Sequence, residues 1–134
     1  MVAWLERVGR HNIATTVISL AEVQCGIERQ RVHHPATSVT LQAWLDSLLL
    51  SGGPHIHVLC IPAALLFARM IETPALRHFT LSDPRQKTIK TGADLAIAAI
   101  AITHGATIAT GNTAHFAQIS RHFPLPGLLN PFQP

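Results

Sequence analysis

The sequence predicts an α/β fold, a three-layer sandwich with a mainly parallel central sheet. Short apolar or β-branched runs alternate along the chain with longer helical patterns, as they do in βαβ units. One helical segment, Leu95 to Ile102, contains no polar side chain, so we expect it to be buried between other elements. A length of 134 residues suits one domain with a substantial core, and we treat residues 1–134 as a single domain.

The first two thirds of the chain contain several predicted helices and strands. We expect helices at residues 1–8, 19–28, 36–50 and 62–71, and strands at residues 12–18 and 55–61. Pro62 suits the first turn of a helix, because the missing amide hydrogen of proline is not needed there. Residues 73–90 contain two prolines and lack a clear period, and they predict a loop.

The segment from Thr91 to Phe116 is the most informative part of the chain. Asp94 opens the apolar helix, and His104 followed by Gly105 predicts its end. Residues 106–110 then form a short apolar strand that leads into the polar turn 111–113. Open α/β sheets bind ligands at the carboxyl ends of their strands, so an acid near this turn indicates an active site.

Three stretches of sequence resemble a known family. Residues 94–116 follow the pattern Asp-Leu-x-Ile-Ala-Ala-x-Ala-x-x-x-Gly-Ala-x-x-x-Thr-x-Asn-x-x-x-Phe, which resembles the carboxyl-terminal signature of PIN-domain nucleases. Residues 16–26, with the dipeptide Ala21-Glu22, resemble the strand and helix that carry a metal-binding glutamate in that family. Residues 125–132 resemble its last strand. Within the family, the chain is most similar to the VapC and FitB-like toxins of bacterial toxin–antitoxin pairs.

The resemblance implies a function and a set of site residues. It implies an endoribonuclease that depends on Mg²⁺ or Mn²⁺, acts on RNA, and is held inactive by a cognate antitoxin protein. Glu22 and Asp94 would bind the metal, and Asn112 would assist them in catalysis. Members of this family form homodimers, and we expect dimer and antitoxin contacts on the apolar helices around Trp44 and Leu66.

One part of the family pattern is absent. The family opens with a strand that ends in Asp-Thr-Asn, whose aspartate is the first metal ligand, and this tripeptide does not occur in the sequence. The chain is therefore expected to lack the first strand of the domain, which would lie centrally between neighbours on both sides. The alternative function is a catalytically inactive, truncated PIN-domain remnant that retains at most antitoxin or partner binding.

Each candidate residue also has a purely structural interpretation. Ser19 and Glu22 have the spacing of a capping box, in which Glu22 would reach back to the start of its helix. Asp94 suits the positive end of a helix dipole. Asn112 suits a turn in the left-handed conformation. Thr110 is a further candidate hydrogen-bond donor within the site.

Composition restricts the remaining possibilities. The net charge of +3 is compatible with a polyanionic substrate, but the basic residues form no dense run. The amino terminus lacks a signal peptide and no apolar run could span a membrane, so we expect a cytoplasmic protein. Cys25 and Cys60 lack the spacing of a metal or redox motif, so we expect both to be buried and reduced. His55 and His57 share a predicted strand face, yet no further ligand is spaced to complete a zinc site. Neither a dinucleotide-binding glycine motif nor a nucleophile elbow occurs.

Overall fold

A computed structural model of the chain describes residues 2–81, 85 and 90–133. Helices and strands alternate along the chain, and the predicted α/β class is confirmed. The elements are α1 (Val2–Val8), η1 (Arg10–Asn12), β1 (Ala14–Thr16), α2 (Val17–His33), α3 (Pro35–Leu50), β2 (His55–His57), α4 (Ile61–Ile71), η2 (Pro74–Phe79), α5 (Ala93–His104), β3 (Thr107–Ala109), α6 (Thr113–Ser120) and β4 (Gly127–Leu129).

The strands pair in parallel, as predicted. β1 lies beside β2, with Ala14 opposite His55, and β3 lies beside β4, with Thr107 opposite Gly127. Within the described residues these are two separate two-stranded sheets. In the family that the sequence resembles, a central strand lies between neighbours on both sides. Among the described residues, no strand joins the β1–β2 pair to the β3–β4 pair.

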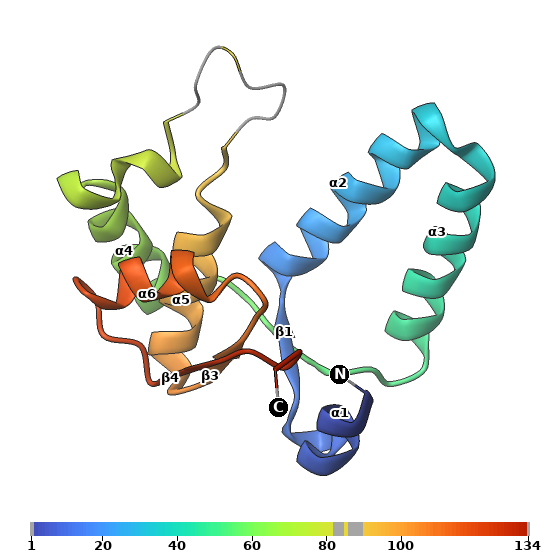
Figure 1. Ribbon diagram of the computed structural model, residues 1–134, viewed down its shortest axis with the longest axis horizontal. Coiled ribbons are helices and arrows are strands. Elements are labelled where there is room, and N and C mark those ends of the chain that lie inside the picture. Colours follow the sequence, from blue (N-terminus) through green and yellow to red (C-terminus); the bar gives the residue numbers. More distant parts are fainter. Residues whose placement is uncertain (1, 82–84, 86–89, 134) are drawn as a thin grey trace.

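The helices form two arms that diverge from the strands (Figure 1). α2 and α3 pack against each other as a long antiparallel hairpin on one side. α4, α5 and α6 form the other side, with β3 and β4 below them in the view of Figure 1. α5 contacts α2, α4, α6 and β3, so it is the element that connects the two arms.

The core is built around α5, whose burial was predicted from its apolar sequence. Leu95, Ala98 and Ile100 are almost completely inaccessible to solvent. Small alanine side chains let the backbones of α4 and α5 approach closely, while the larger side chains fill the space between them. The main cluster comprises Met70, Leu76, Phe79, Leu95, Ala98, Ala99, Ala101, Ile108, Phe116 and Ile119.

The predicted end of α5 is also confirmed. Gly105 has φ 62°, a left-handed conformation that glycine adopts without strain, and its N–H donates to the carbonyl of Ile102. The next amide, Ala106 N–H, donates to the carbonyl of Ala101 at 2.9 Å. These two bonds satisfy carbonyls at the end of the helix and turn the chain directly into β3.

Several predicted boundaries were wrong. α2 begins at Val17 rather than at residue 19 and continues to His33, which shortens the preceding strand to three residues. β2 likewise ends at His57, well before residue 61. The predicted loop at residues 73–90 contains the short helix η2, and its positions 82–84 and 86–89 lie outside the described residues.

Two surface features also bear on the sequence predictions. Cys25 is exposed on α2 and Cys60 is partly buried, so the expectation that both cysteines are buried was wrong for Cys25.

Across the described residues, no helix combines the length and the apolar character that crossing a lipid bilayer requires.

We expect Ile100→Ala to lower the free energy of unfolding by about 2–5 kcal/mol, because it leaves a cavity in the centre of α5. Ile100 is 1% exposed. Val58→Ala, just after β2, is the control, since Val58 is 58% exposed, and it should change the free energy by less than about 0.5 kcal/mol. Urea unfolding followed by circular dichroism measures both, and equal effects would contradict the central position of α5.

Candidate functional site

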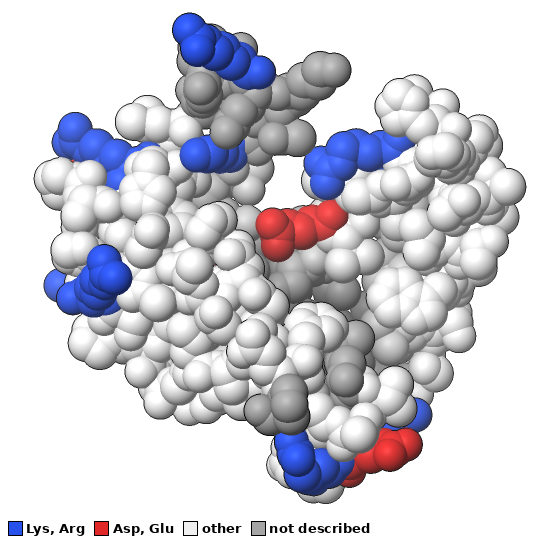
Figure 2. Space-filling model, viewed as in Figure 1, with Lys and Arg blue, Asp and Glu red and all other residues white. Residues whose placement is uncertain are grey.

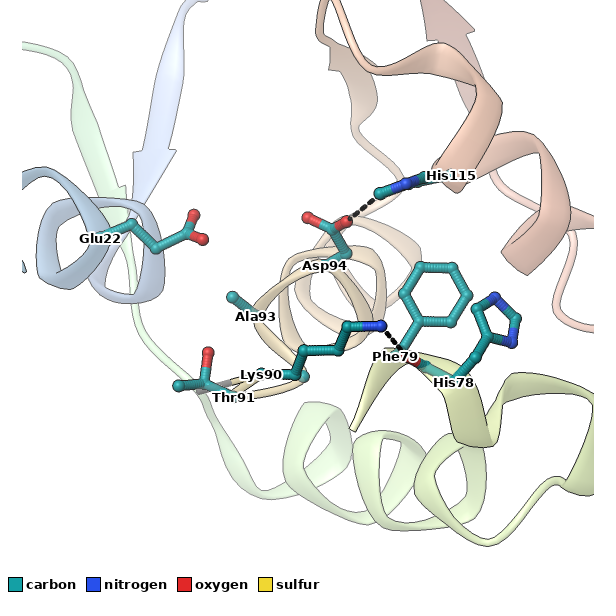
Figure 3. Close-up of a pocket in the computed structure, with 9 residues that line it drawn as sticks. Glu22, His78, Phe79, Lys90, Thr91, Ala93, Asp94 and His115 are labelled. Atoms are coloured by element: carbon teal, nitrogen blue, oxygen red, sulfur yellow. Dashed lines mark hydrogen bonds and ion pairs between the residues drawn. The ribbon is translucent and has the colours of Figure 1, made fainter. Parts of the chain in front are cut away.

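An open pocket of about 240 Å³ lies where α2, η2, the start of α5 and α6 meet. Figure 3 shows Glu22 and Asp94 pointing toward one another from opposite sides of this pocket. Both predicted metal ligands are therefore in the same site, although they lie far apart in the sequence. The pocket is lined by Glu22, His78, Phe79, Lys90, Thr91, Gly92, Ala93, Asp94 and His115.

Glu22 is not part of a helix cap. Thr16 is the N-cap residue of α2, and its hydroxyl accepts a hydrogen bond from the Ser19 N–H at 3.0 Å. Thr16 Oγ1 also lies 3.0 Å from Ser19 Oγ. Because the cap lies three residues earlier than the sequence suggested, Glu22 falls in the second turn of α2 and faces the pocket. The capping-box interpretation of Glu22 was wrong.

Asp94 is fixed by the way α5 begins. Gly92 precedes the helix with φ 71°, and a Cβ atom added there would lie 3.0 Å from Thr80 Cγ2. Only glycine combines this conformation with such close packing. Asp94 follows in the first turn of α5, where the helix dipole favours a negative charge, and its side chain is 25% exposed. The dipole interpretation and the site interpretation are thus compatible.

The surroundings of Glu22 raise the free energy of its charged form. Burial of the carboxyl raises the pKa of Glu22 above its ordinary value, and the negative charge of Asp94 raises it further. Arg29, on the same helix, lowers the pKa of Glu22 and partly offsets these effects. A group held against like charge in this way is typical of functional sites, where a bound cation can relieve the repulsion.

Asn112 reaches the acids only through a third side chain. It is the N-cap residue of α6 with φ −94°, so the left-handed turn interpretation was wrong. Its side-chain nitrogen lies 2.8 Å from His115 Nδ1, and His115 Nδ1 lies 3.0 Å from Asp94 Oδ2. Thr110 also acts locally, because its hydroxyl accepts a hydrogen bond from the Asn112 N–H at 3.0 Å.

His115 is a site residue that the sequence analysis missed. It lies in the first turn of α6, a helix that was not predicted, and its ring meets Phe79 edge-on at 5.7 Å between centroids. The available signal was its spacing: a histidine three residues after Asn112 lies on the same side of a helical turn. Recognising it required knowing that residues 113–120 are helical.

The distribution of charged side chains around the pocket suits a polyanionic ligand (Figure 2). Figure 2 shows acidic side chains in a hollow between the two arms, with basic side chains on both sides of it. Lys90 lines the pocket, and its Nζ donates to the carbonyl of His78 at 2.9 Å. A polyanion that bridges the two arms would contact both basic flanks while reaching the acidic centre.

A zinc centre receives no support from the histidines. His57 stacks face to face on His104 at 4.1 Å between centroids and meets His55 edge-on at 4.7 Å. Partial burial and the two neighbouring rings lower the pKa of His57. In the part of the chain that is described, no group of three or more histidine, cysteine or acidic side chains is arranged to hold a metal ion.

Comparison with known proteins identifies the fold. No family model matches the sequence, and no curated protein matches it. A chain in the crystal structure of VapBC2 from Rickettsia felis, bound to a DNA fragment from their promoter, matches with a TM-score of 0.61 at 22% identity, over 96% of this chain and 82% of that one. A chain of FitAB bound to an IR36 DNA fragment matches with a TM-score of 0.58 at 22% identity, over 99% of this chain and 82% of that one.

These similarities define the class of fold. At 22% identity they do not extend to activity, but they cover almost the whole chain. The protein has a VapC/FitB-like PIN-domain fold, and the fold implied by the sequence motifs is confirmed.

We expect Glu22→Gln to raise the thermal midpoint of unfolding at pH 7. The folded state raises the pKa of Glu22 above its ordinary value of 4.5, so the stabilising contribution of this group is present below that value and is lost as the pH rises through the folded-state pKa. Glutamine resembles the protonated acid, and the gain should therefore disappear when the melts are repeated below pH 4.5.

Glu28→Gln is the control on the same helix. Hydrogen bonds from Arg31 and Gln24 lower the pKa of Glu28, so its contribution is present above the ordinary pKa and lost as the pH falls. The substitution should therefore lower the midpoint slightly at pH 7, opposite in sign to Glu22→Gln. A Glu22→Gln variant less stable than the wild type at pH 7 would contradict the electrostatic description of the site.

Proposed function

We propose that the protein is a metal-dependent endoribonuclease that acts as the toxin of a toxin–antitoxin pair in the cytoplasm. The observation that carries this proposal is the convergence of Glu22 and Asp94 in one pocket of a VapC/FitB-like PIN-domain fold. Two acids from different helices, one with its pKa raised by burial and by the charge of the other, form an arrangement that is typical of functional sites and that a bound cation would stabilise.

The donor chemistry of the pocket fits Mg²⁺ or Mn²⁺. Both acids offer carboxylate oxygens, the ligands that hard divalent cations prefer, and such cations retain several water molecules when few protein ligands are present. The open pocket of about 240 Å³ leaves room for water molecules beside a cation. When bound, the metal supplies an activated water molecule and neutralises charge on a phosphate.

The side chains around the cation have separate tasks. Glu22 and Asp94 bind it from opposite walls of the pocket. Lys90 adds positive charge at the rim, where it attracts the phosphate backbone and orients it toward the acids. Asn112 contributes indirectly, through the His115 ring that it contacts.

RNA is the proposed substrate, and it is distinct from the nucleic acid in the similar structures. The VapBC2 and FitAB complexes are bound to DNA fragments. The basic side chains on both sides of the pocket (Figure 2) suit either polymer, since they attract phosphate rather than a particular sugar. Cleavage assays therefore need both RNA and DNA of the same sequence.

An antitoxin protein and a second copy of the chain are the proposed partners. Trp44 on α3 is 52% exposed and Leu50 is 87% exposed, so this helix presents apolar surface to a partner. Leu66, the other expected contact, packs against the core, and the neighbouring Leu65 is exposed instead. Candidate contacts on α4 therefore centre on Leu65 and Ile61.

A catalytically silent remnant is the second candidate. One observation favours it: among the residues that are described, the acids that converge are only two, without a third metal-binding group beside them. Such a protein would keep its antitoxin-binding surface while cleaving no RNA.

We expect the purified protein to cleave RNA in the presence of Mn²⁺, and we expect Asp94→Asn and Glu22→Gln each to reduce the rate by about 100-fold or more. Loss of a direct ligand should exceed the 10–100-fold cost of losing a group that only supports one. Gel analysis of a fluorescently labelled RNA measures the rates, and Glu28→Gln on the exposed face of α2 is the control. Antitoxin binding without cleavage by the wild type would favour the silent remnant.

A further inference from the structure

His115 holds one oxygen of the Asp94 carboxylate. Its Nδ1 lies 3.0 Å from Asp94 Oδ2, although the two residues are 21 positions apart and belong to different helices. The ring is constrained on two further sides, by the side chain of Asn112 at 2.8 Å and by the edge-on contact with Phe79. Phe79 is itself buried in the core, so the orientation of the imidazole is tied to the packing of the protein.

Hydrogen-bond chemistry sets the tautomer of this ring. An ionised carboxylate can only accept, so Nδ1 carries the hydrogen and donates it to Asp94 Oδ2. The same N–H cannot accept from the amide nitrogen of Asn112. Asn112 then presents its side-chain oxygen to the ring and turns its NH₂ group outward, and the single Nδ1 hydrogen is shared between this oxygen and Asp94 Oδ2.

The hydrogen bond from His115 engages only one of the two carboxylate oxygens of Asp94. Oδ2 is engaged by His115, whereas Figure 3 shows the other oxygen on the side of the carboxylate that faces Glu22. Without the imidazole, the carboxylate could rotate about its terminal bond, which is a soft torsion, and present either oxygen or both. His115 therefore restricts the geometry with which Asp94 can meet a cation.

We propose that His115 is a positioning residue that aims a single oxygen of Asp94, Oδ1, at a divalent cation shared with Glu22. This inference rests on the proposed function, because it concerns the same cation. It also gives Asn112 a definite role: its amide keeps the imidazole turned toward Asp94. Groups that hydrogen-bond a metal ligand fix its orientation, and their loss commonly weakens metal binding by about 10–100-fold.

The test measures Mn²⁺ affinity by electron paramagnetic resonance in the full chain and in two variants. His115→Leu replaces the imidazole with an apolar side chain and removes the hydrogen-bond donor, so Mn²⁺ binding should weaken by about 10–100-fold. His115→Asn places an amide nitrogen where Nδ1 lies, and it should restore affinity to within a few-fold of the wild type. Thermal melts establish that both variants fold.

A second readout needs no metal. At a pH about two units above the ordinary histidine pKa, two-dimensional ¹⁵N–¹H spectra of the metal-free protein should show the Nδ1–H tautomer of His115, and Asp94→Ala should shift it toward Nε2–H. A dominant Nε2–H tautomer in the wild type would overturn the proposal, as would a folded His115→Leu variant that binds Mn²⁺ like the wild type. Folded His115→Asn as weak as His115→Leu would also overturn it.

The same experiments separate this proposal from the proposed function. A wild-type protein that binds no Mn²⁺ overturns the cation site and with it the role of His115. A wild-type protein that binds Mn²⁺ with an affinity insensitive to His115 leaves the cation site in place and overturns the positioning role alone.

Discussion

The burial of α5 is the constraint on which the rest of the structure depends. This helix contacts α2, α4, α6 and β3, so it connects both arms of the molecule. Its alanines admit close neighbours, and Leu95 and Ile100 are almost fully excluded from water. Because Asp94 lies in the first turn of the same helix, the packing of the core also fixes the position of the acid.

The site uses this rigidity to hold an unfavourable arrangement of charge. Glu22 is carried toward Asp94 by α2, whose start is set by the Thr16 cap at the end of β1. Burial of the Glu22 carboxyl and the negative charge of Asp94 together raise the pKa of Glu22, so the ionised side chain makes the folded state less stable. Functional sites commonly lower the stability of the folded state in this way, and the packing of the surrounding core offsets the loss.

Sequence alone predicted the parts of the fold whose cause is local. The apolar run after Asp94 and the glycine at position 105 predicted α5, its burial and its end correctly. Two errors had different causes: the sequence analysis placed the cap of α2 at Ser19, whereas Thr16 occupies it and accepts a hydrogen bond from the Ser19 N–H. His115 was missed because its importance comes from a partner 21 residues away, which local sequence patterns do not reveal.

The most direct test of a cation between Glu22 and Asp94 is anomalous X-ray diffraction from crystals of the full chain grown with MnCl₂. We predict one strong anomalous peak in the pocket, within coordination distance of Asp94 Oδ1 and of a Glu22 carboxylate oxygen, with water completing the coordination. Anomalous peaks elsewhere in the crystal together with none between these two carboxylates would contradict the assignment of the pocket as a metal-binding nuclease site.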